Sequence, residues 1–190
     1  LSGKVVPNFC NPGEKLGWDE VIARTTKKEM KSYFERIRNA HKVSYKVQNV
    51  EMLARIAPNK TVEQVLNEFD TRNLCEDIIS RLAMQKFSKF TLSRLSGGEL
   101  QKVAIAAAIL KEADLYFFDE PSIYLDIYER MRIAREIARL AEEKQVFIVE
   151  HDLSLLDYLA QYVYVIYGVP GAYGIISRIK NARAGINEFM

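Results

Sequence analysis

Two consecutive carboxylates, Asp119 and Glu120, follow directly on the apolar run 115–118. Carboxylates delivered together by a buried strand suit a magnesium nucleotide, because one can hold the metal through water while its neighbour polarises an attacking water. An acidic turn after a strand is also common in proteins that have no such site. The pair by itself therefore indicates phosphate chemistry without establishing it.

A glycine-rich segment, Leu95-Ser96-Gly97-Gly98-Glu99, stands before a long helical pattern. Glycines let a phosphate approach the backbone, and a helix that begins there points its free N–H groups and positive dipole end at the anion. Ser96 adds a hydroxyl donor. A glycine turn that only caps a helix is the plain alternative.

Two further segments complete the set. Residues 121–126 read PSIYLD and lead into a helical pattern, and a later apolar run ends in Val149-Glu150-His151-Asp152. His151 stands where a strand of an open α/β sheet ends, and such sheets bind ligands there. A lone histidine is more often structural, so its meaning depends on the other segments.

The elements that must position these residues follow from the hydrophobic pattern. Short apolar runs alternate with helical patterns in the C-terminal half, and continuous apolar runs are typical of strands buried on both faces of a parallel sheet. The runs span 115–118, 145–149 and 162–167, and the helical patterns span 127–142 and 154–160. Helical patterns between about 49 and 96 predict a helical subdomain inserted into an α/β core.

Composition limits the classes of protein. The 190 residues carry 48% hydrophobic and 27% charged residues with a net charge of +2, which is typical of a globular domain. No stretch approaches the ~18 apolar residues of a membrane span, so no membrane partner is expected. Two distant cysteines, Cys10 and Cys75, are too few for a metal cluster and favour a reducing, cytoplasmic compartment.

In this order and spacing, LSGGE, the Asp119–Glu120 pair, Ser122-x-x-Leu125-Asp126 and His151 resemble the ATP-binding-cassette ATPases. The resemblance implies a P-loop NTPase core of the α/β class, with a parallel sheet and an inserted helical subdomain. It also implies ATP and Mg²⁺ as ligands. Glu120 and His151 are then the catalytic residues, Asp119 a magnesium ligand, and Gln48 in SYKVQNV the Q-loop glutamine near the metal through water. The implied nucleotide-binding residues are Gln48, Ser96, Gly97, Gly98, Glu99, Asp119 and Asp126.

Other segments resemble one branch, the RNase L inhibitor family. They are VEHDLSLLDYL (149–159), YGVPGAYG (167–174), Gly185-Ile186-Asn187 and the opening LSGKVVPNF. The resemblance implies a ribosome-recycling ATPase with two cassettes and an N-terminal iron–sulfur domain. The expected parts are a partial cassette at 1–166, with a helix–loop–helix insertion at about 18–40 and the helical subdomain at about 49–96, and a hinge segment at 167–190.

The helix–loop–helix region is strongly basic. Between residues 24 and 46 the chain holds eight Lys or Arg and two Glu. On a helix opened by a Thr26–Glu29 capping box, one face is basic and the neighbouring face is apolar and able to dock on the cassette. In the family this insertion is used against ribosomal RNA, so the expected partner is the small ribosomal subunit; a solvated amphipathic helix is the alternative. The expected contacts are Lys27, Lys28, Lys31 and Arg38.

The sequence departs from the family in one motif, because no G-x-x-x-x-G-K-[ST] phosphate loop is present. Gly3-Lys4 is followed by Val5 where Ser or Thr would bind magnesium. The loop is expected upstream of Leu1, and the 190-residue chain alone is predicted to be inactive. The alternatives left open are the ATPase subunit of a membrane transporter and a truncated, non-catalytic cassette that binds ribosomes.

Overall fold

The computed structural model describes residues 6–7, 9, 13, 15–38, 42–46, 48–169 and 171–190. Gly3, Lys4, Val5 and Cys10, on which part of the sequence interpretation rests, lie outside these residues, as does Pro170 of the hinge motif. Within the described part, no helix is long and apolar enough to cross a membrane.

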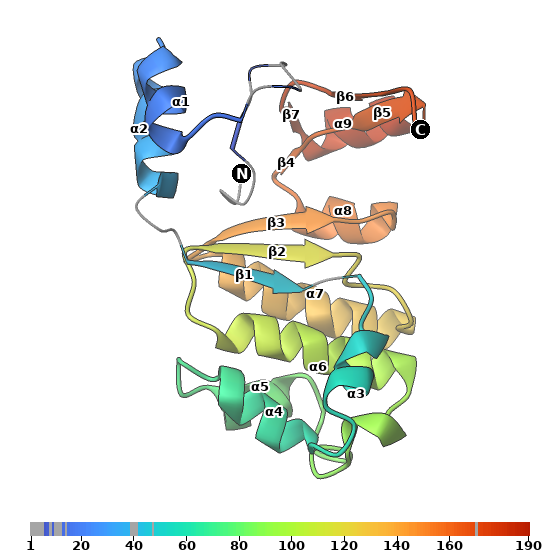
Figure 1. Ribbon diagram of the computed structural model, residues 1–190. Helices are drawn as coiled ribbons and strands as arrows, with labels where there is room; N and C mark the ends of the chain where they lie inside the picture. The colour runs from blue at the N-terminus through green and yellow to red at the C-terminus, as the bar shows by residue number, and fades with distance from the viewer. Residues whose placement is uncertain are drawn as a thin grey trace.

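A three-stranded parallel sheet forms the centre of the fold. Its strands are β1 (Val43–Lys46), β2 (Leu115–Asp119) and β3 (Gln145–Val149), in the order β1-β2-β3. Helices α6 (Gly97–Leu110) and α7 (Ile127–Ala141) lie against one face, where Tyr116 and Phe118 are fully buried (Figure 1). The predicted α/β class and parallel sheet are therefore confirmed.

The other face of the sheet carries a row of aromatic rings. Tyr45, Phe117 and Phe147 share one register across the three strands. Their neighbouring ring centroids lie 5.0 and 5.1 Å apart and nearly parallel. Tyr45 is 37% exposed, so this face is less covered than the one that meets α6 and α7.

The chain between β1 and α6 is helical. It forms α3 (Glu51–Ile56), α4 (Val62–Phe69), α5 (Cys75–Arg81) and the short 3-10 helix η1 (Leu92–Arg94). In Figure 1, α4 and α5 lie below α6 and α3 lies beside it. Thr61 and Gln64 cap α4 reciprocally, each side chain accepting from the other's backbone N–H. Buried Val62, Leu66 and Ile78 join the same core as α6.

Two helices precede the sheet and lie apart from α4–α6 in Figure 1: α1 (Trp18–Arg24) and α2 (Lys28–Arg38). Helix α2 begins one residue later than a Thr26 cap would place it. Its apolar face meets α1, with Trp18 and Phe34 ring centroids 6.0 Å apart, and none of its residues is buried. Among the described residues, the main contact of this face is therefore with α1, and not with the cassette as expected.

The C-terminal part corrects the third predicted strand. After α8 (Leu153–Leu159), the run 162–167 does not enter the parallel sheet. It divides into β4 (Tyr162–Val163), antiparallel to β7 (Lys180–Asn181), and β5 (Ile166–Val169), antiparallel to β6 (Tyr173–Ile176). Helix α9 (Ala182–Phe189) follows. Every residue of β5 and β6 is exposed, so continuous hydrophobicity here marks an open two-stranded hairpin rather than a buried strand.

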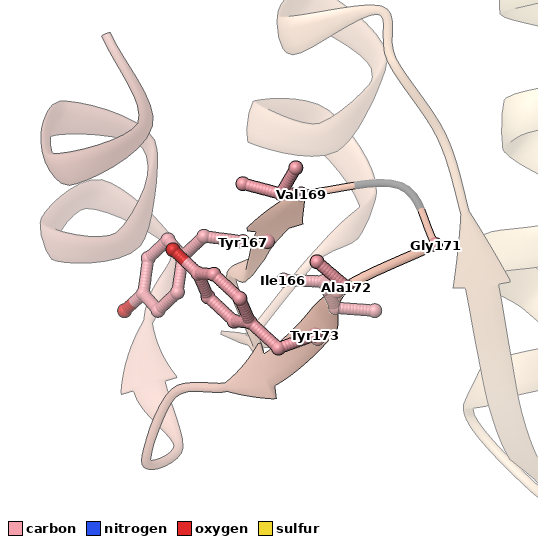
Figure 2. Close-up of a pocket in the computed structure, with 8 residues that line it drawn as sticks. Ile166, Tyr167, Val169, Gly171, Ala172 and Tyr173 are labelled. Carbon is pink, nitrogen blue, oxygen red and sulfur yellow. The ribbon is translucent and has the colours of Figure 1, made fainter.

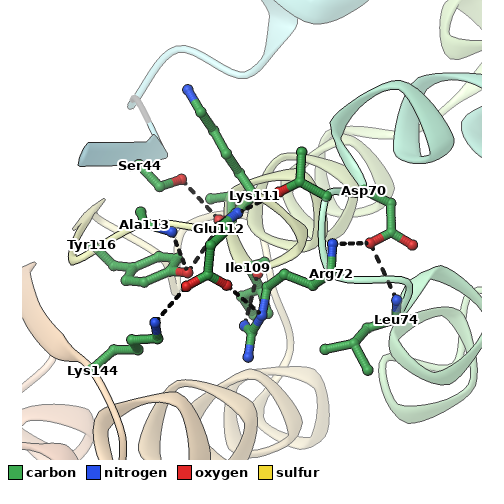
Figure 3. A network of polar contacts seen from close by, with 12 residues as sticks. Ser44, Asp70, Arg72, Leu74, Ile109, Lys111, Glu112, Ala113, Tyr116 and Lys144 are labelled. Carbon is green, nitrogen blue, oxygen red and sulfur yellow. Dashed lines mark hydrogen bonds and ion pairs between the residues drawn. The ribbon is translucent and has the colours of Figure 1, made fainter. Parts of the chain in front are cut away.

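A polar network ties the amino ends of the strands to the helical subdomain (Figure 3). Lys144, just before β3, and Arg72 both pair with the carboxylate of Glu112, at 2.6 and 3.4 Å. The Tyr116 hydroxyl donates to the Lys111 carbonyl, and Asp70 accepts from the backbone of the loop that opens α5. These charges neutralise one another at the end of the sheet opposite to Asp119.

Candidate active site

Four of the predicted site residues lie at or just beyond the carboxyl edge of the sheet. Asp119 is the last residue of β2, Glu120 follows it, and His151 follows β3. Gln48 lies two residues beyond β1 and is exposed. Parallel strands end at one edge, and the open α/β sheet binds ligands there. The structure thus brings together residues that are up to 103 positions apart, as expected from sequence.

Glu120 and His151 face each other across this edge. His151 Nε2 lies 3.4 Å from Glu120 Oε1, and the Glu120 backbone N–H donates to the carbonyl of Val149 at 2.8 Å. The Glu120 side chain is 18% exposed and that of His151 is 75% exposed. Glu120 has φ of 47°, a left-handed conformation that costs about 1–3 kcal/mol for a residue with a side chain. Neighbouring contacts must therefore hold it.

Glu150 connects the two halves of this edge and was not predicted as a site residue. Its carboxylate accepts from the backbone N–H groups of Ser122, His151 and Asp152, at 3.2, 2.8 and 3.1 Å. It thereby joins the loop after β2 to the turn after β3. Its place between the strand and His151 is the only sequence signal for this role.

A second connection runs through Arg130 of α7, which sequence reasoning also missed. Its Nε donates to the Leu125 carbonyl at 2.9 Å, and its Nη1 donates to Asp152 Oδ2 at 2.7 Å. Burial alone raises the pKa of Asp152, but the N–H groups of Leu155 and Ser154 and the Arg130 guanidinium lower it below its ordinary 3.8. The PSIYLD loop and the residues after His151 are thus linked.

Lys46 and Gln101 lie beneath the carboxylates. Lys46 Nζ donates to the main-chain carbonyls of Asp119 (2.6 Å) and Glu120 (3.2 Å), and Gln101 Nε2 donates to the latter at 2.8 Å. Burial lowers the pKa of Lys46 from 10.5 to about 8, against the opposing effect of the Asp119, Glu120 and Glu150 charges. No pattern in the sequence singled out either residue.

The glycine-rich segment opens α6 and packs on the PSIYLD loop. A Cβ added at Gly98 would lie 2.8 Å from the Tyr124 carbonyl, so this glycine is required by a contact within the chain. Ser96 caps α6, and its hydroxyl donates to the Glu99 carboxylate at 2.8 Å. Asp126 caps α7 by accepting from the Glu129 N–H. These residues lie at helix starts, apart from the Glu120–His151 pair.

The predicted RNA contacts lie far from this edge. Helix α2 is on the side of the sheet where the strands begin (Figure 1). Lys27, Lys28 and Lys31 are exposed. Arg38 instead pairs with Asp19 of α1, at 2.5 Å, so its charge is partly neutralised within the helix pair.

A hollow of about 440 Å³ lies at the β5–β6 hairpin, lined by Ile166, Tyr167, Val169 and Tyr173 among others (Figure 2). None of the residues that line it was predicted as a site residue. A smaller hollow of about 180 Å³ lies at the carboxyl edge, between Tyr45, Lys46, Phe117, Asp119 and Val149. Asp119 is the one carboxylate that lines this hollow, and Glu120 follows it on the same edge. The edge fits a magnesium nucleotide, since adjacent carboxylates offer the oxygen donors that Mg²⁺ prefers beside phosphate and water.

The fold and this edge define an ATP-binding-cassette ATPase domain. Residues 19–123 match the family model described as ABC transporter, and the chain belongs to that family. Within it, the chain is similar over its whole length to RNase L inhibitor proteins. A solved structure named RNase-L Inhibitor has a TM-score of 0.89 and 42% identity, covering 99% of this chain and 36% of that one.

Other relatives agree. The archaeal ribosome recycling factor aABCE1, solved with the archaeal ribosomal stalk protein aP1, has a TM-score of 0.89 and 43% identity, over 99% of this chain and 36% of that chain. An uncharacterized ABC transporter ATP-binding protein of Methanocaldococcus jannaschii is 42% identical over all of this chain and 31% of its own length. Translation initiation factor rli1 of Schizosaccharomyces pombe is 38% identical, over 100% and 33%. The chain therefore spans about a third of these curated relatives.

Proposed function

We propose that this chain is the first ATPase cassette of a ribosome-recycling factor, which couples ATP binding and hydrolysis to conformational work on the ribosome. The observation that carries the proposal is similarity along the whole chain, including α1–α2 and the C-terminal hairpin, to a protein named an archaeal ribosome recycling factor. The same similarity disfavours the transporter alternative. The proposed cellular compartment is the cytoplasm.

The carboxyl edge supports hydrolysis by general base catalysis. Asp119 is the proposed magnesium ligand, with Gln48 near the metal through water, and the ion neutralises phosphate charge when bound. Glu120 orients the attacking water and takes its proton as the new oxygen–phosphorus bond forms and ADP leaves. His151, 3.4 Å from the Glu120 carboxylate, is placed to contact the γ-phosphate beside it.

The start of α6 supports a second role, towards nucleotide held by another cassette. Gly97 and Gly98 leave the N–H groups of α6 open to an anion, and Ser96 and Glu99 stand beside them. Asp126, at the start of α7, lies between the two proposed sites. In this arrangement the chain supplies half of each composite site, and the 190 residues alone do not turn over ATP.

The proposed partner of α2 is ribosomal RNA of the small subunit. Lys28 and Lys31 are exposed on α2, with exposed Lys27 directly before it, and such side chains reach phosphates without a sequence requirement. Arg38 contributes less, because it already pairs with Asp19. The iron–sulfur domain and the second cassette belong to the longer protein that the relatives' lengths suggest.

The test is ATP-dependent subunit splitting by the full-length protein. Purified protein, ribosomes and Mg²⁺–ATP are combined, and free subunits are measured by sedimentation. We expect splitting with ATP and none with ADP or with the 190-residue chain. ATP hydrolysis that ribosomes do not change, without splitting, would reject the recycling role; ribosome binding without hydrolysis or splitting would favour the non-catalytic ribosome-binding module.

A further inference from the structure

The Glu120 carbonyl is held by an unusual set of donors. It accepts from Gln101 Nε2 at 2.8 Å, from Lys46 Nζ at 3.2 Å and, more weakly, from the Ile123 N–H at 3.4 Å. The same ammonium donates to the Asp119 carbonyl at 2.6 Å. The two side chains come from different elements, β1 and α6, so the contacts are not a by-product of one local turn.

Both donors are buried at a cost that core packing does not explain. Gln101 is 0% exposed and Lys46 is 1% exposed. Within the described part of the chain, Lys46 forms no ion pair and Gln101 Oε1 has no hydrogen-bond partner. Lys102, the next residue on α6, behaves differently: its buried ammonium is neutralised by Glu129 at 3.0 Å. Buried polar groups with incomplete pairing call for a specific reason.

Resting on the proposed ATPase function, we propose that Lys46 and Gln101 are positioning residues that clamp the Glu120 carbonyl and so aim the Glu120 carboxylate at the water it activates. The Asp119 and Glu120 carbonyls belong to the two peptide planes that flank the Glu120 Cα, and Lys46 bonds both of them. Holding both planes fixes the backbone at φ 47° and with it the direction of the Cβ. Without the clamp, Glu120 relaxes to a common backbone conformation and its carboxylate moves away from His151.

The arrangement also joins three parts of the cassette at one atom. Lys46 ends β1, the strand that leads to Gln48. Gln101 lies one turn inside α6, the helix that begins at Gly97. A shift of β1 or of α6 would therefore change the position of the Glu120 carbonyl. The positive charge of Lys46 further offsets repulsion between the Asp119, Glu120 and Glu150 carboxylates around it.

The experiment compares four variants of the full-length protein: Lys46→Met, Gln101→Leu, their combination, and Ser44→Ala as the matched control. Ser44 is buried on the same strand and donates to the Ala108 carbonyl at 2.8 Å, away from the edge. Turnover at this site is defined as the difference in ATP hydrolysis rate between the wild-type protein and the Glu120→Gln variant. We measure that kcat, the Kd for a non-hydrolysable ATP analogue, and the Tm.

We expect Lys46→Met and Gln101→Leu each to lower kcat about 10- to 100-fold, the range for a misplaced catalytic group, with the Kd within about twofold. The double variant should lose less than the product of the single losses, because both act on one carbonyl. Ser44→Ala should keep kcat within about twofold.

Unchanged kcat in a folded Lys46→Met protein overturns the proposal, as does a kcat loss in Ser44→Ala equal to that of the clamp variants. If Lys46→Met does not fold, Gln101→Leu decides alone by the same criterion. If Glu120→Gln does not reduce ATP turnover relative to the wild-type protein, the proposed function is rejected instead. The two failures are thereby distinguished.

Discussion

The two ends of the parallel sheet treat their charges in opposite ways. At the amino end, Lys144 and Arg72 pair directly with the carboxylate of Glu112. At the carboxyl end, Lys46 gives its hydrogen bonds to main-chain carbonyls, and the carboxylate of Glu120 faces the exposed His151. The buried Lys46 therefore holds the backbone, whereas Lys144 and Arg72 neutralise a side chain; at the carboxyl end Arg130 does pair with Asp152, but not with Asp119 or Glu120.

This difference assigns the two ends of one sheet different proposed roles: the amino end stabilises the fold, and the carboxyl end carries out the reaction. At the amino end, each ion pair reduces the free-energy cost of burying its charges, and the Glu112 carboxylate is fully engaged by its two cationic partners. At the carboxyl end the backbone is fixed while the carboxylates stay available for a metal and a water. Substitutions at the two ends should therefore change different measured quantities.

The largest expected effect is at the carboxyl end. Glu120→Gln keeps the size of the side chain but removes the base, so turnover at this site should fall about 100- to 10,000-fold with ATP binding retained. His151→Ala should lower turnover as well, with binding again retained. Single-turnover hydrolysis and equilibrium binding of ATP by the full-length protein measure the two quantities. Loss of ATP binding in either variant would contradict the assigned roles.

A smaller effect is expected at a surface that belongs to neither end. Reversing Lys27, Lys28 and Lys31 to Glu should weaken binding to the small ribosomal subunit at least about tenfold and reduce the salt dependence of log K by about 2 to 3, since each phosphate contact contributes roughly 0.7–0.9. ATPase activity without ribosomes should not change.

The matched control reverses Lys89, Lys111 and Arg135, which are also exposed; Lys89 and Lys111 lie in loops and Arg135 lies on α7. Subunit binding is measured by sedimentation at several salt concentrations. Equal losses from both triple variants would mean that net charge, rather than α2, governs the association.

The smallest expected effect is on stability near the amino end. Burial alone raises the pKa of Asp70, but backbone N–H groups of Leu74, Arg72, Cys75 and Asn73 bond the carboxylate and lower that pKa below 3.8. Its stabilising contribution is thus present above about pH 4 and is lost as pH falls through the lowered value. Asp70→Ala should cost about 1–2 kcal/mol of unfolding free energy at pH 7, as for a lost cap.

Urea unfolding at pH 7 and near pH 3 measures this contribution. The difference between wild type and Asp70→Ala should shrink at the lower pH, while Asp157→Ala, at an exposed position on α8, should matter little at either pH. A difference that stays constant with pH would show that packing of the loop, and not the carboxylate, is responsible.

Much of the cassette could be predicted from local patterns. Strands β2 and β3 and helices α7 and α8 were predicted close to their observed bounds, because each has a clear hydrophobic period or a continuous apolar run. The run 162–167, like β2, is rich in aromatic and aliphatic residues, yet most of it lies in short antiparallel pairs. The residue types of a segment indicate that it favours extended structure, but the surrounding tertiary structure determines which strand it pairs with.

The sequence alone determined which residues are proposed to carry the reactive groups, because short motifs with defined spacing single out Asp119, Glu120 and His151 at strand ends. The tertiary structure alone decided what holds them. Lys46 and Gln101 approach one carbonyl from 74 and 19 positions away, and Glu150 and Arg130 join loops on different strands. Bonds to backbone atoms leave no side-chain motif at the accepting residue, so only the folded chain reveals them.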